Sequence, residues 1–164
     1  MPTAAVLTIS DRRSAGDAPD ASGPEAAKVL NSWKITVAQT HVLADDADAI
    51  RERVKSLANS VNLIVTTGGS GVGPRDVTPE AVEPLFDRRL PGFGEIMRTA
   101  TFDRTPLSII SRGGAGLIGR SLVVMLPGSP KAVKECLDVL GPAIRHVLAV
   151  LEGAALDCAQ EATR

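Results

Sequence analysis

Aromatic residues are almost absent from this chain. Phenylalanine and tryptophan make up 2% of its 164 residues, and there is no tyrosine. A chain so poor in aromatic rings has little material for stacking nucleic-acid bases. Its charges are also balanced, because 18 lysines and arginines stand against 19 aspartates and glutamates, which leaves a net charge of −1. Since no sequence-wide basic field attracts phosphates, we expect no nucleic-acid partner.

Cysteines are few as well, and no long apolar run is present. Cys136 and Cys158 lie too far apart for a CxxC motif and match no zinc-ligand spacing, so we expect two reduced thiols. No apolar stretch approaches the roughly 20 residues that span a bilayer. No basic segment precedes the first apolar run, as it would in a secretory signal. These features predict a cytoplasmic protein without a membrane partner.

What the chain does contain is an alternation of strand-like and helix-like segments. Buried-strand patterns cover residues 4–10, 62–67 and 121–128, and a β-branched, partly alternating strand pattern covers residues 35–43. A hairpin that turns at Gly119 and Arg120 precedes the last strand. Helical patterns fill the gaps at residues 23–33, 46–60, 78–86 and 129–151. Because strands alternate with helices, we predict an α/β fold with a mostly parallel sheet covered on both faces. A single domain is expected over residues 1–152, followed by a frayed tail over residues 153–164.

Prolines and small polar residues mark the expected helix ends. Pro24 suits the first position of its helix, and Thr78 and Ser129, each followed by a proline, suit the N-cap position. Inside the last helix, Gly141 and Pro142 predict a bend or an interruption, because proline removes a helical hydrogen bond.

Three polar, glycine-bearing loops each follow a predicted strand and lead into a predicted helix. They cover residues 10–24, 66–79 and 126–130. In open α/β sheets, ligands bind beyond the carboxyl ends of the strands. Helix N-termini favour anions there, because their backbone N–H groups are free. We therefore predict that the three loops converge on one anion-binding pocket.

The segment TTGGSGVGPRD, residues 66–76, is the loop richest in glycine. It matches neither GxxxxGK[ST] nor the GxGxxG spacing, so by itself it fits a turn as well as a phosphate loop. Asp76 adds information, because a carboxylate repels phosphates but holds Mg²⁺, which bridges to them. The alternative is that Asp76 caps the local turn or pairs with Arg75.

Other polar side chains near the strand ends also have ordinary alternatives. Asp45 and Asp46 fit helix capping as well as a metal or catalytic role. Ser10 and Asp11 fit either a ligand contact or routine turn hydrogen bonds. Arg112 fits either an anion site or a solvated surface position.

Read together, the motifs SDRRSAG, TTGGSGVGPRDVTPEAV, LPGFGEIMR, SRGGAG and LPGSPKAVKECL cover almost the whole chain. In this order they resemble the molybdopterin adenylyltransferase family, the MogA- and MoaB-like proteins of molybdenum cofactor biosynthesis. The resemblance implies a three-layer αβα fold and a homotrimer. It also implies a Mg²⁺-dependent reaction of ATP with molybdopterin that gives adenylyl-molybdopterin and pyrophosphate. A molybdate-insertion protein is then the implied partner.

The resemblance implies roles for individual residues. Asp45 and Asp76 would be catalytic and would hold Mg²⁺, although LADD stands where many members have VPD and leaves Asp46 as an alternative to Asp45. The implied nucleotide-binding residues are Gly68, Gly69, Ser70, Gly71, Thr78 and Glu80. The implied molybdopterin-binding residues are Ser10, Asp11, Ser111, Arg112, Pro127, Gly128 and Ser129.

One motif bears on whether the chain is an enzyme. This chain has the sequence RDVTPE, whereas a MoaB subgroup that does not catalyse adenylylation has a sequence such as GDQAPE at the same place. The resemblance therefore favours the active branch. Two alternatives stay open. One is a non-catalytic carrier or scaffold that binds molybdopterin, and the other is a nucleotide-pyrophosphate hydrolase of the competence-damage type.

Overall fold

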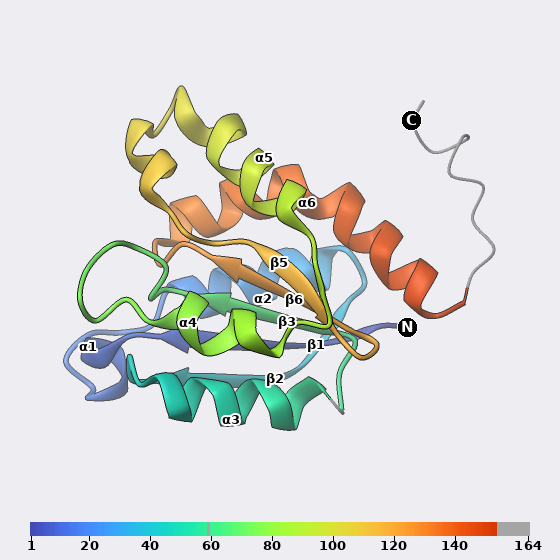
Figure 1. Ribbon diagram of the computed structural model, residues 1–164, viewed down its shortest axis with the longest axis horizontal. Helices are drawn as coiled ribbons and strands as arrows, with labels where there is room; N and C mark the ends of the chain where they lie inside the picture. Colours follow the sequence, from blue (N-terminus) through green and yellow to red (C-terminus); the bar gives the residue numbers. More distant parts are fainter. Residues whose placement is uncertain (59, 154–164) are drawn as a thin grey trace.

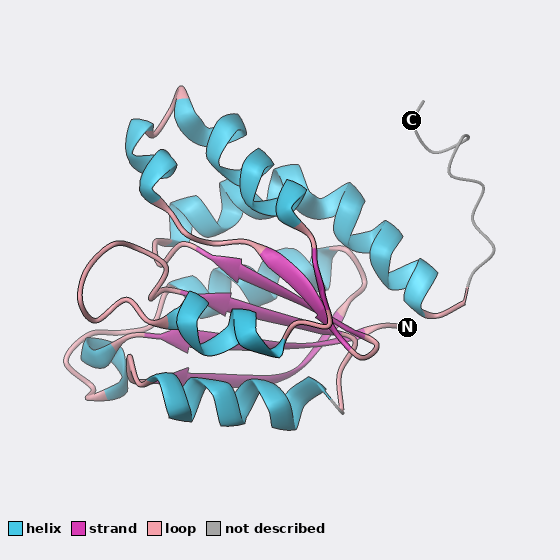
Figure 2. Cartoon of the chain, viewed as in Figure 1, coloured by secondary structure: helices cyan, strands magenta, loops and turns pink. Residues whose placement is uncertain are grey.

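The computed structural model describes residues 1–58 and 60–153, which form a sheet between two layers of helices (Figures 1 and 2). The strands, in chain order, are β1 (Thr3–Ile9), β2 (Thr36–Leu43), β3 (Leu63–Thr67), β4 (Arg88–Arg89), β5 (Ala115–Ile118) and β6 (Ser121–Leu126). In the sheet their order is β2-β1-β3-β6-β5-β4. The first four of these are mutually parallel, while β5 pairs antiparallel with both β4 and β6. The predicted mostly parallel sheet and its hairpin are confirmed.

Helices cover both faces of this sheet. The α-helices are α1 (Asp11–Ser14), α2 (Ser22–Ser32), α3 (Ala47–Ala58), α4 (Thr78–Val82), α5 (Pro91–Phe102) and α6 (Pro130–Leu151). Two 3-10 helices, η1 (Glu83–Leu85) and η2 (Pro106–Ile110), complete the described elements. One face packs against α2, α5 and α6, and the other packs against α3 and α4. The three-layer αβα fold is therefore confirmed.

The core explains why the strands read as continuous apolar runs. Successive side chains of a strand point to opposite faces. In β1, Val6 packs in the cluster beneath α2 and α6, whereas Leu7 packs in the cluster beneath α3 and α4. Every residue of β3 and β6 is buried. By contrast, β2 at the edge alternates between exposed and half-buried residues. The buried parallel strands thus hold their carboxyl ends side by side at one rim.

The helix starts follow the predictions only in part. Ser129 is the N-cap of α6, and its Oγ accepts a hydrogen bond of 3.1 Å from the backbone N–H of Ala132, as predicted. Pro24 is the third residue of α2 instead of the first. Thr78 is the first residue of α4 and no cap, because its hydroxyl donates a hydrogen bond of 2.9 Å to the Gly68 carbonyl. Through this hydrogen bond, Thr78 holds Gly68 at the start of the preceding loop.

The predicted bend or interruption of the last helix is wrong in one respect, since α6 runs without a break from Pro130 to Leu151. Gly141 is explained by packing: a Cβ at this position would lie 2.9 Å from the ring of Trp33. The guanidinium of Arg145 stacks over the same ring at 5.3 Å from its centre. Gly141 therefore permits a close approach of α6 to the end of α2, and Pro142 occurs inside the continuous helix.

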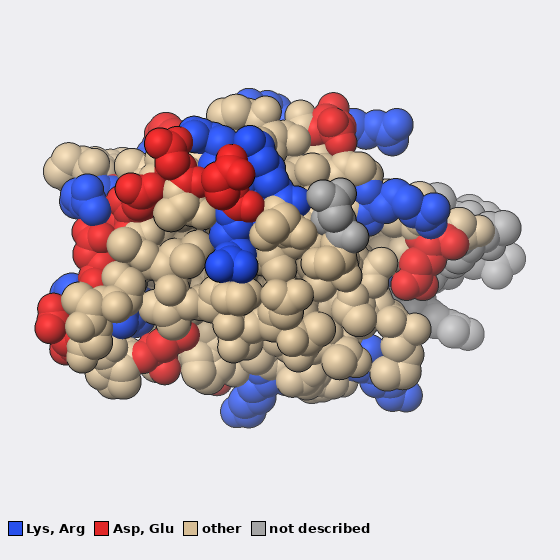
Figure 3. Space-filling view, turned by 90° about the horizontal axis from the view of Figure 1, so that it is seen from below, with Lys and Arg blue, Asp and Glu red and all other residues tan. Residues whose placement is uncertain are grey.

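One face of the molecule carries charged side chains of both signs. Seen from below, acidic and basic side chains stand next to one another beside a broad uncharged area (Figure 3). Within the described ranges, none of the helices combines the length and the apolar character needed to cross a membrane. Residues 154–164, which include Cys158 and nearly all of the predicted frayed tail, lie outside the described part of the chain.

Candidate active site

The loops after β1, β3 and β6 interlock at the carboxyl rim of the sheet. The Gly68 N–H donates a hydrogen bond of 3.2 Å to the Leu126 carbonyl, and the Thr67 hydroxyl donates one of 2.8 Å to the Pro127 carbonyl. Gly68 has a φ of +98°, and a Cβ there would lie 2.2 Å from the Ile9 carbonyl oxygen. Only glycine fits this position, because L-residues avoid that φ and the backbone of β1 leaves no room.

A cavity of about 390 Å³ opens beside the glycine loop, which we define as residues 68–76. Its walls come from the glycine loop, from the loop between β6 and α6, and from α5, η2 and the first turns of α6. The volume is typical of pockets that enclose a small organic molecule. The predicted convergence of strand-end loops on one pocket is realised for the loops after β3 and β6.

The structure divides the predicted site residues into two groups. Those that line the cavity are Gly68, Gly69, Ser70, Gly71, Asp76, Ser111, Pro127, Gly128 and Ser129. Those outside its lining are Ser10, Asp11, Asp45, Thr78, Glu80 and Arg112. The residues of the second group nevertheless lie beside the glycine loop, in contact with it or with the segments next to it.

Asp11, Asp45 and Arg75 form a polar network on the side of the glycine loop away from the cavity. Asp11 and Asp45 exchange hydrogen bonds, since each carboxylate accepts the other residue's backbone N–H, at 2.9 and 3.0 Å. Arg75 then binds both oxygens of Asp11, at 2.9 and 3.1 Å. This pairing lowers the pKa of Asp11, and the N–H of Asp45 lowers it further. Ser10 lies next to the network and caps α1 through a 3.4 Å hydrogen bond from the N–H of Arg13.

The surroundings of Asp45 disfavour the negative charge on its carboxylate. Burial raises the pKa of its carboxyl above the ordinary value, and although the Asp11 N–H opposes this, the negative charges of Asp11 and Asp76 add to it. Asp45 also faces the glycine loop, because a Cβ on Gly69 would lie 3.0 Å from its Oδ1. Asp46 instead caps α3, where its Oδ1 accepts a hydrogen bond of 2.8 Å from the N–H of Ala49. The geometry thus separates the two neighbouring aspartates.

Asp76 closes the glycine loop on itself. Its Oδ2 accepts a hydrogen bond of 2.8 Å from the N–H of Gly73. A Cβ on Gly71 or on Gly73 would lie within 2.9 or 2.8 Å of the same oxygen. The local capping role weighed for Asp76 is therefore present, whereas Arg75 pairs with Asp11 and not with Asp76. Asp76 also lines the cavity, so the same residue closes the turn and borders the space that is open to a ligand.

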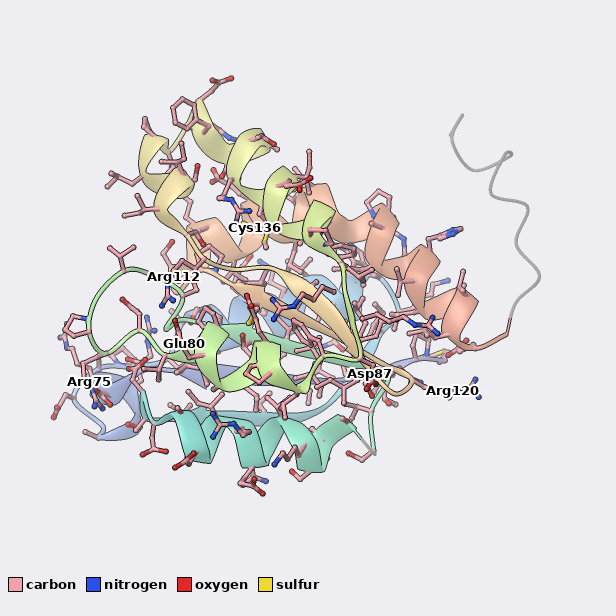
Figure 4. The ribbon with its side chains drawn as sticks, viewed as in Figure 1. Arg75, Glu80, Asp87, Arg112, Arg120 and Cys136 are labelled. Atoms are coloured by element: carbon pink, nitrogen blue, oxygen red, sulfur yellow. The ribbon has the colours of Figure 1, made fainter. Side chains whose placement is uncertain are left out.

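Arg112 is neither free nor simply solvated. Its Nε donates a hydrogen bond of 2.7 Å to the Gly71 carbonyl, and its Nη2 donates one of 2.7 Å to the Asp76 carbonyl. Its Nη1 forms an ion pair with Glu80 on α4 (Figure 4), which lowers the pKa of Glu80. All three nitrogens of the guanidinium are thus engaged by the glycine loop and the helix that follows it.

Sequence reasoning missed the wall that α5, η2 and α6 contribute. This wall consists of Met97, Arg98, Thr101, Thr105, Leu107, Ser108, Ile110, Ala132, Glu135 and Cys136, with Gly113 beside it. Cys136 is buried in the wall, and burial raises the pKa of its thiol to about 11. The motif LPGFGEIMR marked α5 as part of the pattern, but nothing in its residue types indicated that it faces the pocket.

No metal cluster is preassembled in the part of the chain that the structure describes. Among residues 1–58 and 60–153, no group of three or more histidine, cysteine, aspartate or glutamate side chains is arranged to hold a metal ion. Mg²⁺ does not require such a group, because it keeps several waters and is held by one or two carboxylates together with substrate phosphates. Asp45 and Asp76, whose charges repel each other across the glycine loop, offer that donor set.

Comparisons with known proteins show which proteins this chain is similar to. A family model described as "Probable molybdopterin binding domain" matches residues 5–146. A molybdopterin adenylyltransferase from Helicobacter pylori is 38% identical, over 90% of this chain and 86% of the relative. Molybdenum cofactor biosynthesis protein B from Staphylococcus carnosus is 37% identical, over 88% of this chain and 87% of the relative.

Solved structures give the same result. The crystal structure of the molybdopterin biosynthesis enzyme MoaB from Thermus thermophilus superposes with a TM-score of 0.88 at 36% identity, covering 94% of this chain and 98% of that one. The family model covers most of the chain, and the relatives align over nearly their whole length. The chain therefore belongs to the molybdopterin-binding domain family, with the MogA- and MoaB-like proteins of molybdenum cofactor biosynthesis.

Proposed function

We propose that this protein transfers the adenylyl group of ATP to molybdopterin and releases pyrophosphate. One observation carries the proposal: Asp76 closes a glycine loop that forms one wall of a 390 Å³ cavity, while Asp45 faces the same loop from its other side. An adenylyl transfer needs room for an organic group together with carboxylates near the phosphates. The name of the Helicobacter pylori relative supports the same activity.

The proposed binding roles follow the two sides of the glycine loop. Gly69, Ser70 and Gly71 would wrap the nucleotide phosphates with their backbone N–H groups, and Gly68, whose N–H is bonded to the Leu126 carbonyl, would form the base of this cradle. Thr78 would act by shaping that cradle, since its hydroxyl is bonded to Gly68. Ser111 and the loop between β6 and α6 would bind molybdopterin from the opposite cavity wall.

The reaction is a substitution at phosphorus. The terminal phosphate oxygen of molybdopterin attacks the α-phosphorus of ATP, a new phosphoanhydride bond forms, the bond to the β-phosphate breaks, and pyrophosphate leaves. The attacking phosphate is already ionised near neutral pH, so no general base is needed. The residues of the glycine loop therefore contribute by orienting the two anionic reactants.

The proposed reaction is Mg²⁺-dependent, and Asp76 and Asp45 would hold the ion. They fit it, because both are carboxylates beside the glycine loop. Burial first, and then the charges of Asp11 and Asp76, raise the pKa of Asp45, and a bound cation would offset that penalty on its negative charge. When bound, Mg²⁺ would supply positive charge against the triphosphate and the leaving pyrophosphate.

A second candidate is a molybdopterin-binding carrier or scaffold without catalysis, as in the MoaB type of protein. It is favoured by the similarity to the Staphylococcus carnosus relative, which is named molybdenum cofactor biosynthesis protein B and not an adenylyltransferase. For either function we further propose a homotrimer in the cytoplasm, which hands adenylyl-molybdopterin, or the molybdopterin that it carries, to a molybdate-insertion protein.

The test is to incubate the purified protein with molybdopterin, ATP and Mg²⁺ and to measure adenylyl-molybdopterin and pyrophosphate. We expect both products in equal amounts, and a large loss of both in Asp76→Ala. Tight molybdopterin binding without either product would support the carrier instead. Pyrophosphate released from ATP in the absence of molybdopterin would contradict both candidates.

A further inference from the structure

The glycine loop has little apolar packing of its own. Val72 at its tip is 69% exposed, and Pro74 and Arg75 are exposed too. Ordering a backbone residue costs conformational entropy, and glycines lose the most. The contacts inside the loop are few, namely the hydrogen bonds that join Gly73 and Asp76. Bonds from outside must therefore determine where the loop lies.

Arg112 supplies three of these outside bonds, more than any other residue. Besides its guanidinium bonds to the carbonyls of Gly71 and Asp76, its backbone N–H donates a hydrogen bond of 2.8 Å to the Ser70 carbonyl. One residue thus grips the loop at its beginning and at its end. In Figure 4, Arg112 lies at the base of the loop with Glu80 beside it.

The same contacts leave little of Arg112 for a substrate anion. Guanidinium binds phosphate best through two parallel N–H groups. Here Nε and Nη2 point to loop carbonyls, and Nη1 is paired with the Glu80 carboxylate. A phosphate would have to displace either the carboxylate or the loop itself.

The geometry points to Arg112 as a positioning residue: it holds the glycine loop so that Asp76 faces the cavity, and Glu80 orients its guanidinium. This inference rests on the proposed function for its kinetic consequence, but not for its structural one. It replaces direct anion binding by Arg112 and direct nucleotide binding by Glu80, the roles that the family resemblance implies.

The experiment compares Arg112→Ala, Arg112→Lys and Glu80→Gln with Arg120→Ala. Arg120 is a matched control, because its guanidinium also donates to a main-chain carbonyl, that of Leu151, at the opposite end of the sheet (Figure 4). Two readouts are used: amide hydrogen exchange across residues 68–76 in the free protein, and kcat with the Kd for molybdopterin measured separately.

We expect Arg112→Ala to speed exchange at the Gly73 and Asp76 amides, because the loop opens more often. It should lower kcat by about 100-fold through misplacement of Asp76, with the Kd for molybdopterin nearly unchanged. Arg112→Lys should behave similarly, since an ammonium group cannot make the forked contacts. Glu80→Gln should give a smaller effect in the same direction, and Arg120→Ala should change neither readout.

The opposite pattern would overturn the inference. It consists of unchanged exchange in Arg112→Ala, a Kd for molybdopterin weakened by about tenfold or more, and restoration of that Kd by lysine, which keeps the charge. If Arg112→Ala does not fold, Arg112→Lys and Glu80→Gln decide. If the wild-type protein forms no adenylyl-molybdopterin, the proposed function fails, and the exchange measurement alone then supports or overturns the positioning role.

Discussion

The two sides of the glycine loop differ in what they present to a ligand. On one side lies the 390 Å³ cavity, whose wall from α5, η2 and α6 includes Met97, Leu107 and Cys136. On the other side lie Asp11, Asp45 and Arg75, joined by hydrogen bonds and an ion pair. The cavity side offers volume and apolar surface, and the network side offers charge. Asp76 belongs to both, since it lines the cavity and its charge acts on Asp45.

Removing the residue shared by both sides should have the largest effect. We expect Asp76→Ala to lower kcat for adenylylation by on the order of 100-fold, while the Kd for molybdopterin changes little because the cavity wall remains. Product formation and equilibrium binding are measured on the same preparation. Asp87→Ala is the control, since the Asp87 carboxylate also accepts a backbone N–H, that of Gly119, but in the hairpin at the other end of the sheet. Equal losses in both variants would contradict a specific role for Asp76.

Filling the cavity should weaken ligand binding on the apolar side of the glycine loop. Ala132 is half-buried and lines the cavity from the first turn of α6. We expect Ala132→Phe to weaken molybdopterin binding by about tenfold, because the ring occupies ligand volume. Ala143→Phe places the same side chain on an exposed part of the same helix and should leave binding unchanged. Binding titrations decide, and unaltered affinity in Ala132→Phe would place the pterin elsewhere.

The charged side can be tested through the pKa of Asp45. Because its folded pKa lies above the ordinary value of 3.8, the folded state binds this proton more tightly than the unfolded state. Wild-type stability from Asp45 is therefore fully present below pH 3.8 and is lost as the pH rises through the raised folded pKa.

Asp45→Asn removes this pH dependence and keeps an oxygen that accepts the Asp11 N–H. We expect its Tm to match the wild type near pH 3.8 and to exceed it modestly near pH 7, while adenylylation falls. Thermal unfolding from pH 3.5 to 7 measures the difference. Asp46→Asn, which alters only the cap of α3, is the control. A lower Tm for Asp45→Asn at pH 7 would contradict the electrostatic account.

The smallest effect is expected at Cys136, the thiol of the cavity wall. Its pKa of about 11, compared with the ordinary 9.0, predicts roughly 100-fold less thiolate than in an exposed cysteine at pH 8. In a Cys158→Ser background, modification by a thiol reagent should be correspondingly slow and slower still with molybdopterin bound. Reaction at the rate of a free thiol would show that the wall opens.

Sequence patterns predicted the sheet well but the site only in part. The strands were predictable because buried parallel strands are continuous apolar runs, as β3 and β6 are. The ion-pair partner of a charged side chain was not predictable. Asp76 was considered as the partner of its neighbour Arg75, but Arg75 pairs with Asp11, which lies 64 residues away. Short-range reasoning favours adjacent residues, whereas the sheet order brings β1 and β3 together.

Glycines show the same limit. Gly68 belongs to a loop whose sequence fits a turn as well as a phosphate site, and its left-handed φ beside Ile9 gives the physical reason for its presence. Gly141 was expected, with Pro142, to bend or interrupt a helix, but α6 is continuous there and Gly141 accommodates Trp33 from a distant segment. The sequence records that a side chain is missing, but only the tertiary packing reveals whether backbone geometry or a neighbour excluded it.

Because α6 is continuous, it carries the described end of the chain away from the cavity. The helix starts at the cavity with Ser129 as its cap, and its 22 residues extend over about 33 Å. Its far end lies near Met1, since both Met1 and Glu152 border one small pocket. Both ends of the described chain therefore lie far from the glycine loop (Figure 1). A purification tag, a surface tether or a fused enzyme joined at residue 1, or directly after residue 153, would leave the mouth of the cavity accessible.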